Sequence, residues 1–532
     1  MIWLGVDVGS RGARAGLFGP DGDLLSVGKA AFELLQGTGG IAEYRSGDIW
    51  QATCTAVSDA MAAAGIHPDD VSGVGVDAAC SLVLDLPLGE SINPNGEPGR
   101  DCIAWMDHRA AAETDRINRT GAAVLANVGG RISPEMQIPK LLWLSRHRPR
   151  AFAAAGGFYD LADWLTWRMT GAKVRSLCTA VCKWTYSPDR GGWDDIFLRR
   201  IGLGALDADG HARIGTAMTT PGDRIGVLRA DAATELGLAA GTPVGAGLID
   251  AYAGALGTLA AGGESARRMA LIAGTSACHI VLTDRAIAVP GVWGPYPGVI
   301  GSGSWALEAG QSACGAFLDT LVARHPAHLG LVSEAERRGI GLFTLLDEVV
   351  EDATARTPAW TLAARRHVLP DILGNRAPLA DPARRGAITG FGIEGDAQDL
   401  AVEYLAALQA LACGTRHILD EMNSCGVNVS EIIVSGGLSL NRSFLQMTAD
   451  VTGCSVLVPV ATEPVLLGSA MLGAAAGTGA PLAAAVRAMS GQVAKTVDPD
   501  LTQSDTAAGK YRVFRQMLDD QIRYDAIMEG HR

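Results

Sequence analysis

A carboxylate stands beside a glycine-rich turn near the start of the chain. Asp7 lies near the end of the apolar run 2–8, and a turn that begins with Gly9 and Ser10 separates this run from a second one at 13–18. The N–H groups of such a turn can hold an anion such as a phosphate. Because a carboxylate repels a phosphate, Asp7 suits this place if a divalent cation lies between the two. The stretch by itself also fits an ordinary β-hairpin with a solvated aspartate, and slightly favours it.

Two more glycine-rich turns follow apolar runs in the second half of the chain. One contains Gly274 and Thr275, and the other contains Gly436 and Gly437 ahead of a helical pattern that begins at Asn441. Each turn alone indicates only the end of a strand. Together the three turns predict a cleft in which two similar halves hold a nucleotide. Glycine lets a phosphate or an adenosine approach the backbone, and a helix N-terminus attracts negative charge.

Asp250 is the most distinctive single acidic residue. It follows the apolar run 241–249 and precedes a short helical pattern over 251–256. One interpretation is a helix N-cap, a common use of aspartate at this place. The other is a general base that takes the proton of an attacking hydroxyl during phosphoryl transfer. The local pattern leaves both interpretations open.

Composition places the chain among globular enzymes. Its 532 residues exceed what one hydrophobic core normally holds, so we expect two large domains. Hydrophobic residues make up 48% and charged residues 19%, which is typical of a folded soluble protein and not of a disordered one. The formal net charge of −13 argues against nucleic acid or an acidic membrane face as a partner.

The ten cysteines are scattered, and none belongs to a CxxC pair. Cys178 and Cys182 stand four residues apart, but no second pair or histidine cluster completes a zinc site. We therefore expect reduced, mostly buried thiols and a cytoplasmic location. The first residues are typical of a strand and not of a signal peptide, and no charge-free apolar run is long enough to span a bilayer.

The expected elements alternate between strands and helices, which indicates an α/β fold. In the first half we expect strands at 2–8, 13–18, 23–32, 74–78, 81–86 and 241–249, helices at 48–64, 110–119, 140–144, 159–169 and 251–256, and an extended segment at 177–186. In the second half we expect strand, turn and strand at 269–282, a strand at 431–435, and helices at 396–425, 441–452, 463–476 and from 507 onward. The pattern of 2–18 returns at 269–282, which indicates two similar halves joined near 257–268 by a linker at 262–265.

Eight segments carry recognisable motifs, at 5–17, 105–109, 133–144, 247–257, 273–279, 308–312, 435–441 and 463–473. In this order they cover nearly the whole chain, and together they resemble the FGGY carbohydrate kinase family. Two further motifs, Cys182-Lys183-Trp184 and Val292-Trp293-Gly294-Pro295, are most similar to the pentulose kinase branch, above all to D-ribulokinases.

The resemblance implies an α/β fold of two domains like actin and hexokinase, of the ribonuclease H-like class, with a cleft between them. We expect a first domain at 1–262, a second at 263–480 and a helical tail at 481–532. The resemblance further implies a kinase that uses ATP and Mg²⁺ to phosphorylate a terminal sugar hydroxyl, converting D-ribulose to D-ribulose 5-phosphate. It also implies a homodimer.

The resemblance assigns roles to individual residues. Asp250 is the expected catalytic base, and Asp7 and Asp250 are expected to hold Mg²⁺ through water. The residues expected at the nucleotide are Asp7, Gly9, Ser10, Arg14, Gly274, Thr275, Gly436, Gly437 and Asn441. The residues expected at the sugar are Ala79, Cys80, Trp105, Asp107, Arg109, Lys183, Asp250 and Glu308. Without the resemblance, Lys183 would be interpreted as an ordinary surface lysine.

Three positions depart from the family pattern. Ser10 stands where the first loop usually has threonine, Gly12 where it has serine, and Ala309 where a glycine is usual. We expect activity to survive, with weaker phosphate or metal contacts. Another pentulose or a pentitol (L-ribulose, D-xylulose, ribitol) and a non-kinase ATPase remain as alternatives. A dinucleotide-dependent oxidoreductase is disfavoured because the opening strand lacks a G-x-G-x-x-G that runs into a helix.

Overall fold

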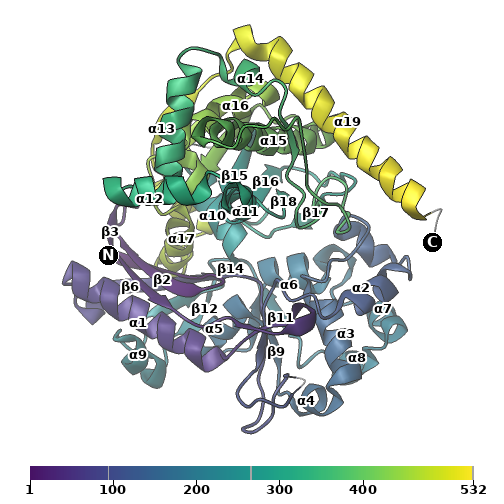
Figure 1. Ribbon diagram of the computed structural model, residues 1–532. Helices are drawn as coiled ribbons and strands as arrows, with labels where there is room; N and C mark the ends of the chain where they lie inside the picture. The colour runs from purple at the N-terminus through teal and green to yellow at the C-terminus, as the bar shows by residue number, and fades with distance from the viewer. Residues whose placement is uncertain (94, 264–266, 530–532) are drawn as a thin grey trace.

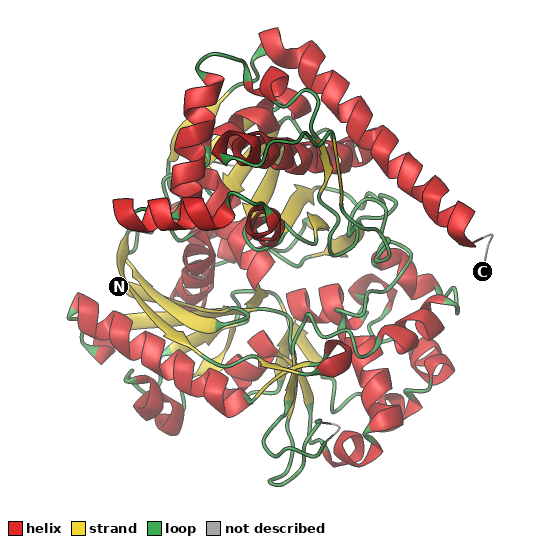
Figure 2. Cartoon of the chain, viewed as in Figure 1, coloured by secondary structure: helices red, strands yellow, loops and turns green. Residues whose placement is uncertain are grey.

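The computed structural model describes residues 1–93, 95–263 and 267–529 and consists of two lobes (Figure 1). Each lobe contains a seven-stranded sheet surrounded by helices (Figure 2). The prediction of a two-domain α/β fold is therefore confirmed. Residues 264 and 265 of the predicted linker lie outside the described residues.

The first lobe is built on a sheet in the order β12-β13-β6-β1-β2-β3, with β14 paired to β6. The strands of this sheet are β1 (Ile2–Val8), β2 (Gly12–Phe18), β3 (Leu24–Ala31), β6 (Val71–Ala78), β12 (Arg224–Val227), β13 (Pro243–Gly245) and β14 (Leu248–Ile249). Its smaller sheets contain β4 (Leu35–Gln36), β5 (Ala42–Tyr44), β7 (Leu82–Leu84), β8 (Cys102–Ile103), β9 (Phe158–Asp160), β10 (Val174–Ser176) and β11 (Ala217–Thr219). Its helices are α1 (Ser46–Ala64), α2 (Ala111–Asn118), α3 (Gln137–His147), α4 (Pro149–Ala154), α5 (Leu161–Thr170), α6 (Leu177–Trp184), α7 (Asp195–Ile201), α8 (Gly204–Ala208), α9 (Ala230–Leu236) and α10 (Asp250–Leu259).

The second lobe is built on a sheet in the order β17-β18-β16-β15-β21-β22-β23. Its strands are β15 (Arg268–Ala273), β16 (Ala277–Thr283), β17 (Trp293–Pro297), β18 (Trp305–Gln311), β21 (Glu431–Ser435), β22 (Ser455–Pro459) and β23 (Val493–Val497), and β19 (His367–Leu369) pairs with β20 (Ala387–Thr389) outside this sheet. The helices that follow β15 are α11 (Gly315–Arg324), α12 (His328–Arg338), α13 (Leu342–Thr354), α14 (Ala359–Leu362), α15 (Ala397–Ser424), α16 (Arg442–Thr452), α17 (Pro464–Thr478), α18 (Leu482–Met489) and α19 (Ser504–Glu529).

The two large sheets share one local arrangement. In the first lobe β1 pairs with β2 as an antiparallel hairpin and with β6 in parallel. In the second lobe β15 forms the same hairpin with β16 and the same parallel pair with β21. The repeat predicted from 2–18 and 269–282 is thus present, and it places both hairpin turns at the carboxyl ends of parallel strands, where α/β proteins bind ligands.

Helix α17 joins the lobes, because it lies between β22 and β23 of the second lobe's sheet in the chain but packs on β1, β6 and α10 of the first lobe. Small residues make this contact close. A Cβ atom on Gly75 of β6 would lie 1.8 Å from the carbonyl oxygen of Ser469, and one on Gly257 of α10 would lie 2.0 Å from that of Pro464. Backbone therefore packs directly on backbone where the two lobes meet.

One predicted element is wrong: residues 177–186 are not extended, because Leu177–Trp184 forms helix α6. The helix has only eight residues, seven of them buried, and a run this short does not distinguish a helix from a strand by periodicity alone. The hydroxyl of Ser176 accepts the N–H of Cys178 and caps the start of the helix. The turn of helix brings Lys183 to the cleft.

The structure also differs from the expected pattern in detail. The run 241–249 forms two short strands, β13 and β14, and the segment 325–385, which carries no clear sequence pattern, holds α12, α13, α14 and β19. The run 396–425 forms one long helix, α15. Within the described ranges, none of the helices is long and apolar enough to cross a membrane.

Candidate active site

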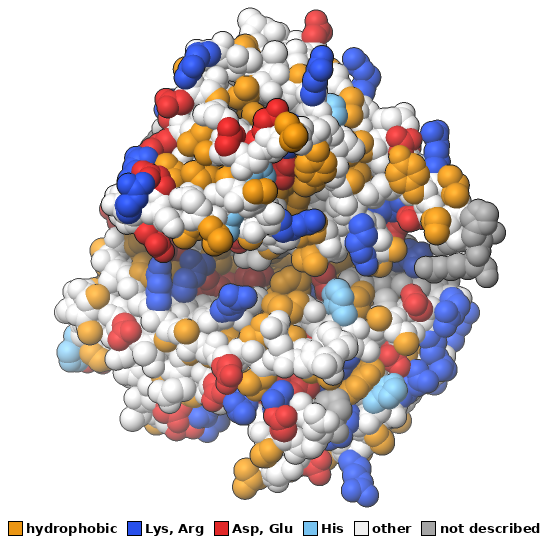
Figure 3. All heavy atoms as spheres, in the orientation of Figure 1, with side chains coloured by type: hydrophobic (Ala, Val, Ile, Leu, Met, Phe, Trp, Pro, Cys, Tyr) orange, Lys and Arg blue, Asp and Glu red, His pale blue; other side chains and the backbone are white. Residues whose placement is uncertain are grey.

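A cavity of about 610 Å³ opens between the lobes. Figure 3 shows a hollow at this level of the molecule, with acidic and basic side chains inside it. Most of the residues expected at phosphate and sugar line the cavity, namely Asp7, Gly9, Ser10, Arg14, Ala79, Cys80, Trp105, Lys183, Asp250, Gly274, Thr275 and Glu308. Residues that are far apart in the sequence and come from both lobes thus meet around one space.

Strand register brings three aspartates together, of which Asp7 and Asp250 line the cavity and Asp77 lies buried behind them. Asp7 of β1 is the direct neighbour of Asp77 on β6, and Asp77 is also the neighbour of Leu248 on β14, two residues before Asp250. Asp77 is fully buried and accepts a hydrogen bond from the hydroxyl of Ser469 on α17. Burial and the charge of Asp7 raise the pKa of Asp77 well above its usual range. A raised pKa favours the neutral form of Asp77, so this residue adds little negative charge to the cleft.

Asp250 occupies the first turn of α10, and its Oδ1 accepts the N–H of Ala251 at 2.7 Å. Burial, followed by the negative charge of Asp7, raises its pKa to about 6, although the Ala251 N–H and Lys183 act in the opposite direction. A carboxyl group of this pKa is ionised at neutral pH and is a better proton acceptor than an exposed aspartate. The contact with Ala251 is that of a residue at a helix start, and the raised pKa suits a proton acceptor.

Arg14 lies over the carboxylate cluster. Its Nε donates to Asp7 Oδ2 at 2.8 Å, and its Nη1 donates to Glu463 at 2.7 Å, so it links the hairpin β1–β2 to the segment that precedes α17. On the other side of the turn, the indole Nε1 of Trp105 donates to Ser10 Oγ at 2.8 Å. Both contacts fix the first hairpin turn, whose backbone carries Gly9 and Ser10 into the cavity.

The far end of the cavity holds a buried ion pair. Lys183 and Glu308 are each only 3% exposed, and Lys183 Nζ lies 3.3 Å from Glu308 Oε1. Tyr252 Oη donates to Glu308 Oε2 at 2.9 Å, and the ammonium of Lys183 lies 4.4 Å from the ring centre of Trp293. Burial alone would lower the pKa of Lys183, but the charge of Glu308 outweighs it and raises the pKa above the ordinary lysine value. Lys183 is not a solvated surface residue.

Ala79 and Cys80 line the cavity beside this pair. Burial raises the pKa of the Cys80 thiol to about 12, so the thiol stays protonated and is unsuited to act as a nucleophile. The side chain contributes shape to the wall of the cavity. We therefore assign no covalent chemistry to it.

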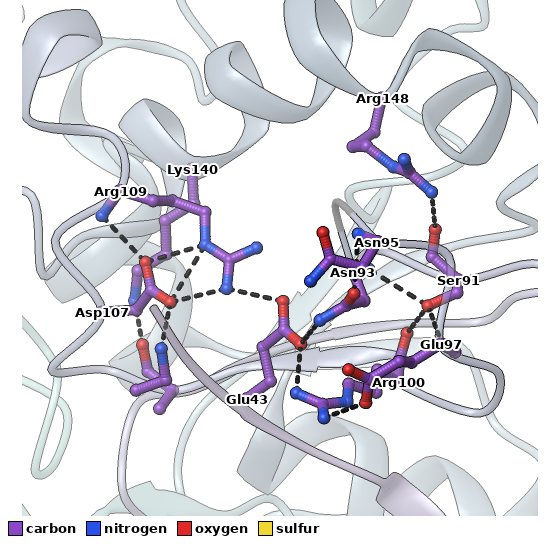
Figure 4. Close-up of polar contacts among 12 residues, drawn as sticks. Glu43, Ser91, Asn93, Asn95, Glu97, Arg100, Asp107, Arg109, Lys140 and Arg148 are labelled. Atoms are coloured by element: carbon purple, nitrogen blue, oxygen red, sulfur yellow. Dashed lines mark hydrogen bonds and ion pairs between the residues drawn. The ribbon is translucent and has the colours of Figure 1, made fainter. Parts of the chain in front are cut away.

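Asp107 and Arg109 do not reach the cavity, although they were expected at the sugar. Figure 4 shows them in a buried network with Glu43 of β5, in which Arg109 Nη2 lies 2.7 Å from both carboxylates. Asp107 also accepts the backbone N–H of Ala42 at 2.6 Å. Lys140, beside them, donates to the carbonyl oxygens of Ala104, Trp105 and Glu135. This network braces the segments that present Trp105 and Glu135 to the cavity.

A second cavity of about 600 Å³ adjoins the first, and both are lined by Gly274 and Thr275. Its wall contains Gly437 and Asn441. The amide of Asn441 donates to Asp347 at 2.7 Å and to Tyr404 Oη at 3.0 Å, while its oxygen accepts the N–H of Phe444 at the start of α16. Two adjoining cavities can hold a nucleotide, with its base in one cavity and its terminal phosphate in the other.

Gly436 stands at the end of β21, beside the second cavity. Its φ is +83°, and a Cβ atom there would lie 2.6 Å from the carbonyl oxygen of Ala273. Only glycine fits this position without strain. The residue shapes the turn that presents Gly437 and Asn441.

Three polar residues of the site were not predicted from the sequence: Asp77, Glu135 and Arg376. The sequence does contain a feature that could have indicated Asp77, because Gly75-Val76-Asp77 repeats Gly5-Val6-Asp7. Glu135 and Arg376 line the same cavity, but Arg376 comes from the segment without a pattern. No local feature of that segment indicated that it returns to the cleft.

The residues at the floor of the cavity fit a magnesium ion. Mg²⁺ prefers carboxylate oxygens, keeps several of its waters and binds near substrate phosphates. Asp7 and Asp250 supply such oxygens beside the two hairpin turns. Within the described part of the chain, a compact three-ligand cluster, Asp195, Asp207 and His211, lies elsewhere, and Arg199 already pairs with Asp207. The carboxylates of the cleft therefore suit an ion that is held through its water molecules.

Comparison with known proteins finds one family over nearly the whole chain. Residues 2–257 match the N-terminal domain, and residues 269–477 the C-terminal domain, of the FGGY family of carbohydrate kinases. An FGGY carbohydrate kinase domain-containing protein of Homo sapiens is 41% identical over 99% of this chain and 98% of its own length. A D-ribulokinase of Saccharomyces cerevisiae is 36% identical over 89% of this chain and 72% of its own length.

Solved structures agree on the fold. A xylulose kinase from Rhodospirillum rubrum superposes with a TM-score of 0.79 at 22% identity, covering 98% of this chain and 99% of its own. Glycerol kinase from Plasmodium falciparum superposes with a TM-score of 0.75 at 13% identity, covering 97% of this chain and 98% of its own. The chain belongs to the FGGY family of carbohydrate kinases, and it is a sugar kinase.

Proposed function

We propose that this sugar kinase phosphorylates D-ribulose to D-ribulose 5-phosphate with ATP, and that Asp250 is its general base. The observation that carries the proposal is the position of Asp250, in one cavity with the phosphate-type turns and with the Lys183–Glu308 pair. The similarity to a protein named D-ribulokinase supports the choice of sugar.

In this proposal ATP binds across the two adjoining cavities in one orientation. The adenosine occupies the space beside Gly437 and Asn441, and the phosphates pass the turn of Gly274 and Thr275 toward Ser10. The N–H groups of both turns neutralise phosphate charge, as turns of this kind do in other phosphate sites. Mg²⁺, held by Asp7 and Asp250 through water, supplies further charge neutralisation when it is bound.

The acceptor sugar lies between Asp250 and the Lys183–Glu308 pair. Glu308 accepts and Lys183 donates hydrogen bonds to sugar hydroxyls, so that the terminal hydroxyl faces Asp250. Its oxygen attacks the γ-phosphorus, the bond from that phosphorus to the β,γ-bridging oxygen breaks, and the hydroxyl proton passes to the Asp250 carboxylate. ADP leaves with the electrons of the broken bond. Closure of the lobes excludes water, which competes with the sugar as acceptor.

The test is a coupled assay of ADP release with Mg·ATP and a panel of D-ribulose, L-ribulose, D-xylulose, ribitol and glycerol. The proposal predicts the highest kcat/KM with D-ribulose and a loss of about 10²–10⁴-fold in Asp250→Asn, the range typical of a general base. If the enzyme prefers another sugar, that sugar is the substrate and the proposed mechanism is unchanged. ADP release that does not depend on sugar contradicts the acceptor and the base together.

A further inference from the structure

Arg376 is a buried cation in the acceptor end of the cavity, and the mechanism above does not use it. It lies between β19 and β20 of the second lobe, and its side chain is only 10% exposed. Its guanidinium lies against Gly310 of β18, where an added Cβ would be 3.2 Å from Nη1. Gly310 is two residues from Glu308, so Arg376 stands beside the buried ion pair.

The segment that carries Arg376 is held in shape by its own hydrogen bonds. The backbone N–H and C=O groups of Asn375 and Asp381 bond to each other at 2.9 Å. The Asn375 side chain donates to Asp371 at 3.1 Å and accepts the N–H of Leu379 at 3.1 Å. A Cβ on Gly291 would lie 1.7 Å from the carbonyl oxygen of Pro378, so the segment also packs tightly on the chain before β17. Arg376 is thus presented by a defined loop.

The guanidinium has few good partners within the protein. Its Nη2 lies 3.5 Å from Glu135 of the first lobe, its Nη1 lies 3.8 Å from Cys278 Sγ, and its plane is 5.6 Å from the ring centre of Trp293. Its Nε is enclosed by protein and has no hydrogen-bond partner among the described residues, so a ligand in the cavity meets the terminal nitrogens of the guanidinium. A guanidinium carries five N–H donors, and burying them without acceptors is costly. This arrangement points to an acceptor atom supplied by the ligand.

The donors and acceptors of the cavity narrow the choice of ligand atom. Asp250, Glu308 and Glu135 accept hydrogen bonds and therefore suit hydroxyl groups. Lys183 already pairs with Glu308 and Trp293, and its remaining N–H donors serve sugar hydroxyls. Arg376 can only donate, and the carbonyl oxygen of an open-chain ketose can only accept. The two are the matching donor and acceptor at this end of the site.

We propose that Arg376 recognises the carbonyl oxygen of the acceptor and thereby selects a ketose over the corresponding alditol. The proposal rests on the proposed pentulose kinase function. Glu135 holds the guanidinium from the opposite lobe, so the contact is complete only when both lobes enclose the sugar. Arg376 would then be a specificity-determining residue that the first lobe positions and the second lobe carries.

The test compares D-ribulose with ribitol, which differ by the carbonyl group alone. We would measure KM for D-ribulose and the inhibition constant of ribitol against it, in the wild type, Arg376→Gln and Arg376→Lys. Arg385→Gln is the control, because Arg385 is an exposed cation of the same loop whose hydrogen bonds within the described part of the chain go to the nearby carbonyl oxygens of Pro382 and Arg384. KM for ATP reports on the nucleotide site, and thermal unfolding reports on the stability of each variant.

The expected result is a rise of about tenfold or more in KM for D-ribulose in Arg376→Gln, the size of one lost hydrogen bond to a charged group, with ribitol inhibition and KM for ATP unchanged. Arg376→Lys keeps the charge opposite Glu135 and should fall between the wild type and Arg376→Gln. If Arg376→Gln does not fold, Arg376→Lys is the variant that tests recognition of the carbonyl oxygen. Equal weakening of D-ribulose and ribitol, or no weakening of either, overturns the inference.

A failure of the proposed function gives a different result. If another ketose is the preferred acceptor, it and its alditol replace D-ribulose and ribitol in the same comparison. A wild-type preference for ribitol or glycerol overturns the role of Arg376 and leaves Asp250 as the base. Loss of activity in Asp250→Asn tests the base alone, because Asp250→Asn does not alter the Arg376 loop.

Discussion

Glu308→Gln should destabilise the fold, because it leaves the ammonium of Lys183 buried without a charged partner. Both side chains are 3% exposed and their charged atoms lie 3.3 Å apart. Removal of one member of a buried pair costs about 3–5 kcal/mol. The Trp293 ring, 4.4 Å from Lys183 Nζ, contacts the ammonium in the wild type and in the variant alike, so this contact does not offset the loss. The expected loss is therefore about 3–5 kcal/mol of unfolding free energy.

The measurement is urea unfolding at neutral pH of the wild type, Glu308→Gln, Lys183→Met and the double variant. The double variant has no unpaired buried charge, so it should be more stable than Glu308→Gln alone and should recover most of the loss. The same variants should all lose sugar-dependent activity, because both residues line the sugar end of the cavity.

Two results would refute this reasoning. If Glu308→Gln unfolds at the wild-type urea concentration, Lys183 is not held in a dry environment by Glu308. If the double variant is less stable than both single variants, the two residues stabilise the protein independently and do not form the pair described. Either result would remove the basis for placing the sugar against Lys183 and Glu308.

Three further predictions test other parts of the site. Since the pKa of Asp250 is raised to about 6, kcat/KM for the sugar should be half-maximal near pH 6, level off above about pH 7 and approach a tenfold fall for each pH unit below about pH 5, as the base becomes protonated; a profile flat down to pH 5 would contradict the assignment. Gly75→Ala should lower the melting temperature and the activity, because its Cβ would meet the Ser469 carbonyl oxygen at 1.8 Å, whereas Gly47→Ala, with nothing within 4 Å, should change neither. Asn441→Ala should raise KM for ATP several-fold through loss of the Asp347 contact and the α16 cap, with KM for the sugar unchanged; equal effects on both constants would argue against a nucleotide role.

Local sequence patterns predicted the parts of the fold that depend on neighbouring residues. The hairpin that presents Asp7, the strand and turn before Gly437, and the helix behind Asn441 follow from apolar runs, glycines and a capping residue, and the structure contains all three. The family resemblance supplied what these patterns left open, since Lys183 alone would be taken for a surface residue.

Long-range packing accounts for what sequence reasoning missed. Helix α6 is only eight residues long and seven of them are buried, and periodicity alone does not separate a helix from a strand in so short a run. Arg376 reaches the cavity only because a loop of the second lobe folds back on Gly291. Asp107 and Arg109 were expected at the sugar, and the structure places them behind the cavity wall, where they pair with Glu43. Each of these depends on contacts between segments that are far apart in the sequence.

The central claim is that Asp250 transfers the proton when a pentulose is phosphorylated. The most direct measurement is ADP release with Mg·ATP and D-ribulose in the wild type and in Asp250→Asn. The account predicts strong stimulation by D-ribulose in the wild type and its loss in Asp250→Asn, while ATP binding persists. Stimulation that survives in Asp250→Asn, or ADP release that ignores the sugar, would contradict it.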